Sequence, residues 1–378
     1  MKITDVKVRK LSYRASYPIA NSQSTHLYDA RVTTIVEVLT DEGITGVSTS
    51  SMFDDMCRQI IAGYLKKQIV GANPLHCERI WHQMFNGETE GRAAIAKGEV
   101  IMSMSAIDTA IWDLVGKKLG VPLCHLLGGF RDQVPCYASG GHYTSLTSQK
   151  DELKHLEWEM AQYMEMGYKA VKMRVGRDVQ QDSERAKLVR EVIGPRTKLL
   201  MDFNSSPSYR GGVPHALKFI RALEKHDVYW FEDPLVMDDL AGLKQLSTVV
   251  DAAIAVGEWE QTRWGFRDLI KDRVVDVILP DATSMCGGVT EWRKIAAMAD
   301  ACRIPVAAHI GDNVHIHCIA AVPNGLIVEV FTPLETERLR YLRDPVLKPN
   351  RDGMLDVSTK PGTGLELDED YISRHVAG

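Results

Sequence analysis

The pattern of apolar and polar residues changes about a third of the way along the chain. Residues 1–50 alternate in the manner of β-strands, and their polar stretch at 16–29 is too long for a hairpin turn, which is typical of a lid or binding loop. From residue 52 to 120 the pattern turns helical. It is clearest over residues 100–119, where apolar residues recur every three or four positions, and Gly120 follows as a helix C-cap. The first third of the chain therefore predicts a small α+β domain.

Beyond residue 130, short apolar and β-branched runs alternate with longer amphipathic segments. There are eight such runs, at residues 136–138, 170–173, 198–202, 228–232, 254–258, 277–281, 304–309 and 326–329. Strands that alternate with helices imply parallel strands linked by crossovers, and eight such units suit a closed barrel better than an open sheet. Residues 331–378 contain scattered Pro and Gly without a helical period, so we expect this tail to wrap back over another part of the molecule.

Composition excludes several classes of protein. The 378 residues are 45% hydrophobic and 25% charged, which is ordinary for a globular protein, and the formal net charge is −5. A basic surplus or stripe, as expected of a nucleic-acid binder, is missing, and no run reaches the roughly 18 apolar residues that a membrane span needs. The N-terminus lacks the apolar stretch of a signal peptide, and the seven cysteines include no Cys-x-x-Cys pair. We expect a cytoplasmic protein that binds neither nucleic acid nor membranes.

Seven of the eight predicted strands carry a charged or titratable residue at or next to their end. These residues are Lys172, Asp202, Glu232, Glu258, Asp281, His309 and Glu329. Successive members are 20 to 30 residues apart, about one strand, one helix and two loops, so a barrel would gather them at its C-terminal mouth, where barrel enzymes have their active sites. A single Asp or Glu after a strand is often only a helix N-cap, but seven residues in phase, without Ser, Thr or Asn, favour a catalytic ring.

Three carboxylates of this ring, Asp202, Glu232 and Glu258, come from consecutive strands. They would repel one another unless a cation lay among them, and ligation by oxygen alone points to Mg²⁺ or Mn²⁺ rather than zinc. Such an ion can hold a substrate carboxylate and stabilise negative charge that develops on it. A run of three histidines, His309, His315 and His317, is the weaker alternative metal site, for zinc.

The remaining ring residues suggest a base and a positive charge. Asp281 and His309 end adjacent strands, and the carboxylate would fix the imidazole tautomer and raise its basicity, which gives a general base near neutral pH. Lys172 and Arg174 are two residues apart, so on a strand they point to the same side and suit an anionic substrate. Their alternative role is a pair of salt bridges to the acidic ring. Glu329 could donate a proton or a hydrogen bond to a substrate oxygen.

This constellation resembles the mandelate racemase subgroup of the enolase superfamily over nearly the whole chain. Residues 105–114 are similar to the capping-domain helix of that family, and Lys172-Met173-Arg174 lies where the family has Lys-x-Lys. Its metal-ligand motifs, its Asp–His dyad and its acid on the eighth strand are matched by Met201-Asp202-Phe203-Asn204, Phe231-Glu232-Asp233-Pro234, Gly257-Glu258, Pro280-Asp281 with Gly287-Gly288-Val289-Thr290, His309 and Glu329.

The resemblance implies a fold and a chemistry. The fold is an α/β protein with an N-terminal α+β capping domain at residues 1–128 and a (β/α)7β TIM-like barrel at residues 129–330, with residues 331–378 packing back on the capping domain. In the chemistry, Mg²⁺ chelates a carboxylate substrate, a base removes the α-proton and an enediolate forms. In the acid-sugar dehydratases of the group, the β-hydroxyl then leaves and a 2-keto-3-deoxy acid results. The family also implies a homo-oligomer.

Arg174 departs from the family pattern. A guanidinium is protonated at any working pH and is a poor base, whereas a racemase needs a proton acceptor on both faces of its substrate. The chain offers one conventional base, the Asp281–His309 pair, which favours dehydration of a sugar acid (aldonate or aldarate); Arg174 could instead clamp a carboxylate or hydroxyl. Two alternatives stay open: a racemase or epimerase of a 2-hydroxy acid with a different second base, and a non-catalytic barrel that binds a small acid.

Substrate specificity in the resembled family comes from N-terminal loops, which here correspond to residues near 16–29 and 48–54. His26 and Tyr17 are candidate substrate contacts, although both could equally be solvated loop residues. Asn204, two residues beyond the first metal ligand and expected on the same strand face, is a further candidate, as is Ser139 at the end of the first barrel strand.

Overall fold

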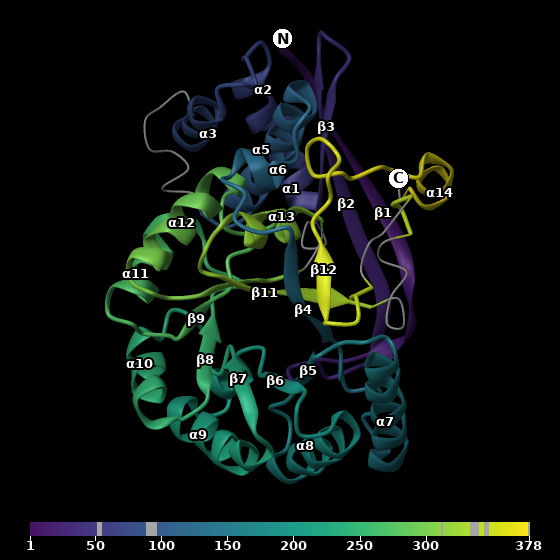
Figure 1. The fold of residues 1–378 in the computed structure, drawn as a ribbon, viewed down its shortest axis with the longest axis vertical. Helices are drawn as coiled ribbons and strands as arrows, with labels where there is room; N and C mark the ends of the chain where they lie inside the picture. Colours follow the sequence, from purple (N-terminus) through teal and green to yellow (C-terminus); the bar gives the residue numbers. More distant parts are fainter. Residues whose placement is uncertain (51–54, 88–96, 311–312, 333–339, 344–347, 377–378) are drawn as a thin grey trace.

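The computed structural model describes residues 1–50, 55–87, 97–310, 313–332, 340–343 and 348–376 (Figure 1). The N-terminal third of the chain contains an antiparallel sheet whose strands lie in the order β1 (Ile3–Ile19), β2 (Tyr28–Thr40) and β3 (Thr45–Ser50). The helical elements among the described residues of this part are α1 (Asp55–Ile60), the π-helical turn η1 (Ile61–Leu65), α2 (Lys66–Ile69), α3 (Cys77–Asn86), α5 (Glu99–Leu119) and α6 (Leu123–Leu126).

Helix α5 packs against β2 and β3 and forms the centre of this α+β unit. Ile107, Ile111 and Leu114 recur every three or four residues and are fully buried, so one face of the helix lies in the core. Gly120 ends the helix with a φ of 69°, a left-handed conformation that costs glycine little. The predicted helix and its C-cap are confirmed.

Parallel strands among the described residues close into a barrel, because β11 pairs with β4 as well as with β10. The strands are β4 (Gln133–Ser139), β5 (Ala170–Arg174), β6 (Lys198–Asp202), β7 (Val228–Glu232), β8 (Ala253–Val256), β9 (Val277–Ile278), β10 (Val306–Ala308) and β11 (Gly325–Phe331). The surrounding helices are α7 (Gln149–Glu165), α8 (Val179–Ile193), α9 (Gly212–Leu223), α10 (Leu240–Val249), α11 (Thr262–Lys271), α12 (Val289–Ala301) and α13 (Asn313–Ala321), with the 3-10 turns η2 (Ser206–Tyr209) and η3 (Glu224–His226) (Figure 1). The predicted (β/α)7β barrel with an N-terminal cap is confirmed.

The barrel interior is packed with side chains from alternate strand positions. A buried cluster of inward-facing residues fills it, formed by Tyr137, Ala170, Leu200, Trp230, Ala255, Val277, Leu279, Ala307 and Ile327. Because side chains on one face of a strand recur every second residue, the residue two positions after each of these points the same way, towards the C-terminal mouth. For most strands that residue is a member of the predicted ring.

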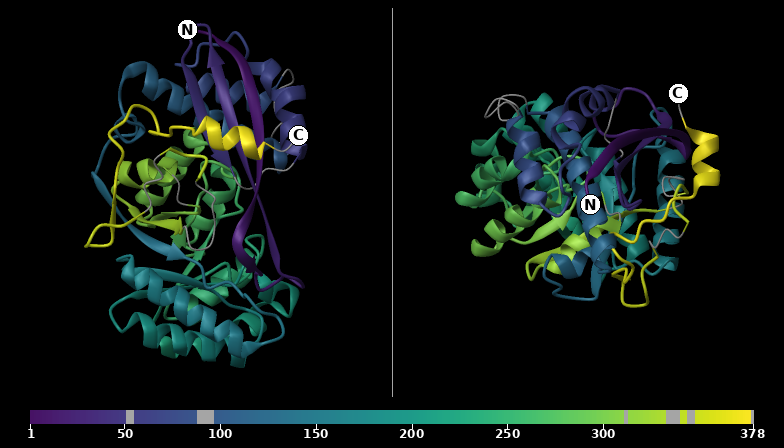
Figure 2. Two further views of the ribbon diagram at one scale, coloured as in Figure 1. Left: turned by 90° about the vertical axis from the view of Figure 1, so that its right-hand side faces the viewer. Right: turned by 90° about the horizontal axis from the view of Figure 1, so that it is seen from above.

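The C-terminal segment runs back over the barrel and ends beside the N-terminal sheet (Figure 2). Strand β12 (Met354–Asp356) pairs antiparallel with β4, and helix α14 (Glu369–His375) lies beside β1. The Arg9 guanidinium is 2.6 Å from a Glu369 carboxylate oxygen, and Leu11 forms a β-bridge with Val376. The domain boundaries given above stay predictions.

The predicted specificity loops need a correction. Residues 16–19 belong to β1 and residues 28–29 to β2, so the connection between these strands covers only residues 20–27. The strand pattern was obscured there by polar side chains on an exposed edge. Residues 48–50 end β3, whereas residues 51–54 lie outside the described residues. In the part of the chain that the structure describes, none of the helices is long and apolar enough to cross a membrane.

Candidate active site

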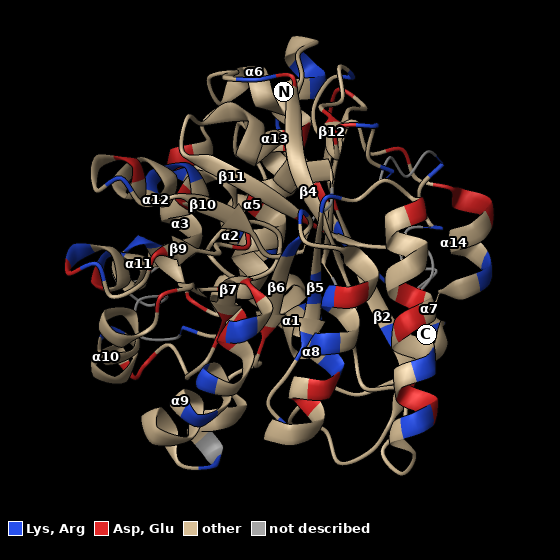
Figure 3. Cartoon of the chain, turned by 60° about the horizontal axis from the view of Figure 1, so that its bottom comes forward, with Lys and Arg blue, Asp and Glu red and all other residues tan. Residues whose placement is uncertain are grey.

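The seven predicted ring residues lie together at the C-terminal mouth of the barrel. Asp202 and Glu232 are the last residues of β6 and β7, Lys172 and Glu329 lie within β5 and β11, and the other three members follow β8, β9 and β10 by one to three residues. All seven are buried, with His309 the most exposed at 9%. Figure 3 shows charged residues of β5 and β7 inside the ring of helices. The topology therefore brings together residues that are spread over about 160 positions, because the carboxyl ends of parallel barrel strands meet at one mouth.

Asp202, Glu232 and Glu258 form a compact acidic triad. One carboxylate oxygen of each lies within 4.8 Å of those of the other two. Burial raises the pKa of Glu232 to about 8, although the Lys172 ammonium, 2.5 Å from its Oε1, opposes this. Burial also raises the pKa of Glu258 against the effect of His309. Buried carboxylates this close need a cation to stay ionised, and an all-oxygen set fits a hard divalent ion such as Mg²⁺.

Trp230 helps to hold this triad and was not expected from the sequence. Its indole nitrogen donates a hydrogen bond of 3.1 Å to Glu232 Oε2 from inside the barrel. The signal was present in the sequence, because Trp230 precedes Glu232 by two residues and so shares its strand face. A buried indole on that face needs an acceptor, and the neighbouring carboxylate provides it.

His309 and Asp281 form the predicted pair. Nδ1 of His309 lies 3.1 Å from Asp281 Oδ2, and Nε2 lies 3.3 Å from Glu258 Oε2. Burial disfavours the charged imidazole, but Glu258 and Asp281 outweigh it and raise the pKa of His309. Burial also opposes the ionised form of Asp281, but the imidazoles of His309 and His315 hold its pKa well below the usual range. The carboxylate thus fixes Nδ1 as the protonated nitrogen and leaves Nε2 facing the triad.

The other oxygen of Asp281 is held by the loop that follows β9. Oδ1 accepts hydrogen bonds from the Thr283 amide and hydroxyl, each at 2.8 Å, and from the Ser284 amide at 2.9 Å. These three donors leave Asp281 one orientation, with Oδ2 towards His309. Sequence reasoning found the pair but not the loop that aims it.

Lys172 and Arg174 both point into the mouth, as their spacing predicts. Lys172 Nζ lies 2.8 Å from Glu329 Oε1 and 3.4 Å from Asp202 Oδ2, in addition to its contact with Glu232. The Arg174 guanidinium pairs with Asp202 and donates to Ser139 Oγ at 3.5 Å. Salt bridges to the acidic ring, weighed above as the alternative for these two residues, are therefore present in the structure.

His142 belongs to the site and was missed. Its Nε2 accepts a hydrogen bond of 3.3 Å from Arg174 Nε, and burial together with the Arg174 charge holds its pKa well below the ordinary value. Only the first predicted strand lacked a titratable residue at its end. His142, three residues beyond Ser139, fills that place, and a search slightly further past the strand would have found it.

Glu329 is an acceptor in this arrangement. Burial would raise its pKa, but Lys172 and His309 hold the pKa well below the ordinary value. Its Oε2 accepts a hydrogen bond of 2.8 Å from the Ile310 amide. An ionised carboxylate has no proton to give, so the predicted donor role would require Glu329 to be protonated after the substrate binds.

Asn204 does not share the face of Asp202 on the strand. Strand β6 ends at Asp202, and Asn204 is left-handed with a φ of 46°, so the expected alternation stops before it. The backbone N–H of Asn204 donates to Asp202 Oδ1 at 2.7 Å, and its backbone carbonyl accepts from the Gln23 side chain. Among the described residues its buried Oδ1 has no hydrogen-bond partner, so the side chain keeps a free acceptor.

The connection over residues 20–27 contacts the loop after β6. The Ser22 hydroxyl donates to the Phe203 carbonyl at 2.8 Å, which anchors this connection near the mouth. His26 is exposed there and lies 3.4 Å from the Thr25 hydroxyl. The Tyr17 hydroxyl instead donates to Glu159 on α7, at 3.1 Å. The structure therefore does not bring these two candidates into the ring.

The later histidines of the His run serve other contacts. His315 Nε2 accepts from the Ala282 amide at 2.9 Å, and His317 Nδ1 accepts from the Cys124 amide at 3.2 Å, both from helix α13. Ring nitrogens engaged with backbone amides are not available to a metal. In the described parts of the chain, the acidic triad is the group whose ligand atoms could hold an ion.

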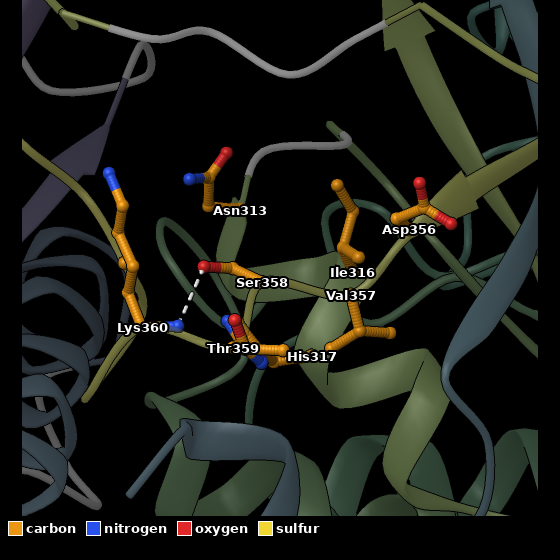
Figure 4. A pocket seen from close by; sticks show the side chains of 9 residues that line it. Asn313, Ile316, His317, Asp356, Val357, Ser358, Thr359 and Lys360 are labelled. Carbon is orange, nitrogen blue, oxygen red and sulfur yellow. Dashed lines mark hydrogen bonds between the residues drawn. The ribbon is translucent and has the colours of Figure 1, made fainter. Parts of the chain in front are cut away.

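A separate cavity of about 380 Å³ lies between α13 and the segment that follows β12. Figure 4 shows that its lining consists of side chains from α13, from the end of β12 and from the segment after it, namely Asn313, Ile316, His317, Asp356, Val357, Ser358, Thr359 and Lys360, together with Gly364. None of these residues belongs to the ring. The convergent titratable groups at the barrel mouth therefore define the candidate active site.

Comparison with known proteins agrees with this geometry. The family model described as "Mandelate racemase / muconate lactonizing enzyme, N-terminal domain" matches residues 3–128, and the one described as "Enolase C-terminal domain-like" matches residues 155–371. Arabinonate dehydratase of Saccharolobus solfataricus is 32% identical over 345 residues, 88% of this chain and 87% of the relative. The 3,6-anhydro-α-L-galactonate cycloisomerase of Streptomyces coelicolor is 28% identical over 98% of this chain and 99% of its own.

Solved structures lead to the same group. The crystal structure of a racemase from Streptomyces coelicolor with bound magnesium superposes with a TM-score of 0.88 at 26% identity, over 99% of this chain and all of that one. The two family models and the relatives at about 30% identity span both parts of the fold.

Proposed function

Because the chain belongs to the mandelate racemase / muconate lactonizing enzyme family of the enolase superfamily, we propose that it is a Mg²⁺-dependent dehydratase of a sugar acid. Its substrate would be an aldonate or aldarate, a small carboxylate, and its product a 2-keto-3-deoxy acid. The arabinonate dehydratase relative supports this substrate class. The cytoplasmic location and the homo-oligomer stay predictions.

One observation carries the proposal: the site has a conventional base on one side and a guanidinium on the other. His309 and Asp281 supply the base. Arg174, where a second lysine would stand in the family, is bound to Asp202, Ser139 and His142 and cannot accept a proton. Racemisation needs an acceptor on each face of the α-carbon, whereas elimination of water needs only one.

Asp202, Glu232 and Glu258 would hold the ion. Bound there, Mg²⁺ would hold the substrate carboxylate, stabilise the charge that develops on it, and weaken the attraction of Glu258 for a proton on His309. The Lys172 ammonium, released from its contacts with the triad, would lie beside the same carboxylate. Glu329 keeps this ammonium in place through the 2.8 Å contact.

His309 would then remove the α-proton at Nε2, while its Nδ1–H stays bonded to Asp281. The electron pair of the broken C–H bond delocalises into the carboxylate. Its return expels the β-hydroxyl, which takes a proton and leaves as water, and the resulting enol tautomerises to the 2-keto acid. If elimination is syn, the imidazolium can supply that proton itself, so that one residue acts as base and then as acid.

The proposal is tested with purified enzyme, Mg²⁺ and a stereochemically complete set of mono- and diacid sugars in D₂O. We expect a 2-keto acid from at least one member, and a His309→Asn variant that folds but produces none. Turnover by that variant at the wild-type rate would refute the assignment of the base. Binding of an acid without any keto acid or α-proton exchange would favour the non-catalytic barrel.

An isomerase is the second candidate, favoured by the cycloisomerase relative that covers nearly the whole chain. The two reactions differ in mass balance, because dehydration releases water and isomerisation does not. Mass spectrometry of the products therefore separates them. Exchange of the α-proton with solvent without loss of water would place the isomerase first.

A further inference from the structure

The loop that aims Asp281 is bound on its other side by the capping domain. Residues 281–290 cover most of the loop between β9 and α12 together with the first two residues of α12, and this segment lies against helix α5. The Thr109 hydroxyl donates to the carbonyl of Ala282, the residue next to Asp281, at 2.9 Å. Both groups are buried, so solvent does not compete for this hydrogen bond.

Further contacts from α5 hold the rest of the segment. Ser105 Oγ accepts from the Gly287 amide at 2.8 Å, and the Asp108 carboxylate accepts from the Thr290 amide at 2.8 Å and from its hydroxyl at 2.7 Å. The Trp112 indole donates to the same hydroxyl at 2.8 Å. The helix residues that make contact, Ser105, Asp108, Thr109 and Trp112, follow the spacing i, i+3, i+4, i+7. They therefore form one polar face of α5.

The fit between the two elements is close at Gly288. A Cβ atom at this position would lie 2.4 Å from an Asp108 oxygen, and the backbone has a φ of 92°. Only glycine allows the helix and the segment to approach so closely. The end of β3 adds one more contact, since Ser50 Oγ lies 2.8 Å from Ser284 Oγ.

We propose that this polar face of α5 is a positioning element for the catalytic pair. It fixes the segment so that the donors of Thr283 and Ser284 converge on Asp281 Oδ1, which leaves Oδ2 for His309. The capping domain would thus determine the orientation of a base that lies wholly in the barrel. The proposal rests on the proposed function in taking Asp281 and His309 as that base.

The helix offers a matched control. Ser103 and Ser105 are both fully buried, and each donates to the carbonyl four residues earlier, at 2.7 and 2.9 Å. Ser105 alone of these two contacts the segment, so Ser105→Ala and Ser103→Ala differ in that contact. Thr109→Val removes the bond to Ala282 with little change of volume, and Thr109→Ser keeps the hydroxyl.

The experiment measures kcat, KM and amide hydrogen exchange of residues 281–290 in the four full-length variants with Mg²⁺. For Thr109→Val we expect kcat to fall about 10- to 100-fold with KM little changed, because a base misplaced by a fraction of an ångström slows proton transfer. Exchange in the segment should rise about tenfold or more. Ser105→Ala should show the same changes to a smaller extent, whereas Thr109→Ser and Ser103→Ala should stay near wild type.

Several results would overturn the positioning role. One is an unchanged kcat in Thr109→Val although amide exchange in the segment becomes faster. Another is an equal decrease of kcat in Ser103→Ala and Ser105→Ala. The third is amide exchange of the segment in Thr109→Val that stays as slow as in the wild type. If the wild-type enzyme turns over no sugar acid, the proposed function fails, but the exchange measurement still decides whether α5 holds the segment.

Discussion

Asp281→Asn exchanges one atom of the catalytic pair and leaves the volume of the site unchanged. In the wild-type protein Oδ1 accepts three hydrogen bonds from Thr283 and Ser284, and Oδ2 accepts the Nδ1 proton of His309. An amide has one acceptor oxygen and one donor nitrogen. It must therefore choose which of the two sides receives its NH₂ group.

The loop decides that choice. Turning the NH₂ group towards the loop would leave three buried donors without an acceptor, at about 1 kcal/mol or more each. The orientation with the oxygen on the loop side is therefore favoured by a free energy of about 3 kcal/mol. In this orientation the NH₂ group faces His309. The imidazole can accept that hydrogen bond only with an unprotonated Nδ1, so its proton moves to Nε2, the atom that has to act as the base.

We expect kcat to fall about 10³- to 10⁴-fold, or about 4–5.5 kcal/mol in the barrier, as for the wrong tautomer in hydrolytic triads. The assay is release of 2-keto acid from the substrate found in the screen, with α-proton exchange in D₂O as a second readout. Mg²⁺ affinity, measured by calorimetry, should not change, because Asp281 is not part of the acidic triad.

Thr283→Val is the control for this variant. It removes the hydroxyl donor of Thr283 but leaves both amide donors and the tautomer intact, so kcat should fall less than about tenfold. A kcat for Asp281→Asn within about tenfold of wild type would refute the reasoning. So would an equal loss in the two variants.

Two other predictions concern stability. Burial raises the pKa of Glu232 from 4.5 to about 8. Between these two pH values the folded protein without metal keeps a proton on Glu232 that the unfolded chain has lost. The free energy of unfolding therefore falls as the pH rises from about 4.5 to about 8. A bound cation replaces that proton, so Mg²⁺ should raise Tm more at about pH 8 than at about pH 6, and a larger shift at the lower pH in a calorimetric scan would contradict this. Asp113 accepts from the buried amides of Val47 and Thr363, both at 2.8 Å, so Asp113→Ala should lower the free energy of unfolding by about 2–4 kcal/mol. Urea unfolding measures this change. A decrease of the free energy of unfolding below about 0.5 kcal/mol would show that Asp113 does not stabilise the contact between the N-terminal sheet and the C-terminal segment.

The ring at the barrel mouth was predictable because each of its members belongs to a local pattern. An apolar run identifies a strand, the alternation of strands and helices makes the strands parallel, and parallel strands end at one mouth. Asp202 and Glu232 needed nothing beyond this logic. Their residue types then narrowed the chemistry, since clustered carboxylates call for a cation and an Asp–His pair provides a base.

Contacts between distant segments could not be derived in this way. Ser105 and Gly287 are 182 residues apart, and no periodicity in either segment indicates that one accepts a hydrogen bond from the other. The ionised state of Glu329 and the place of His142 likewise depend on which charges burial brings within a few ångströms. Asn204 fails the expected alternation because its backbone turns left-handed where the strand ends.

The sequence by itself thus determined which residues reach the mouth of the barrel and what chemistry their types allow. The tertiary structure alone decided how these residues are aimed and charged. The physical reason is that the direction of a strand, and the face of it on which each side chain lies, follow from residues that are close in the sequence. Protonation and orientation follow from the packing of segments that meet only in the folded chain.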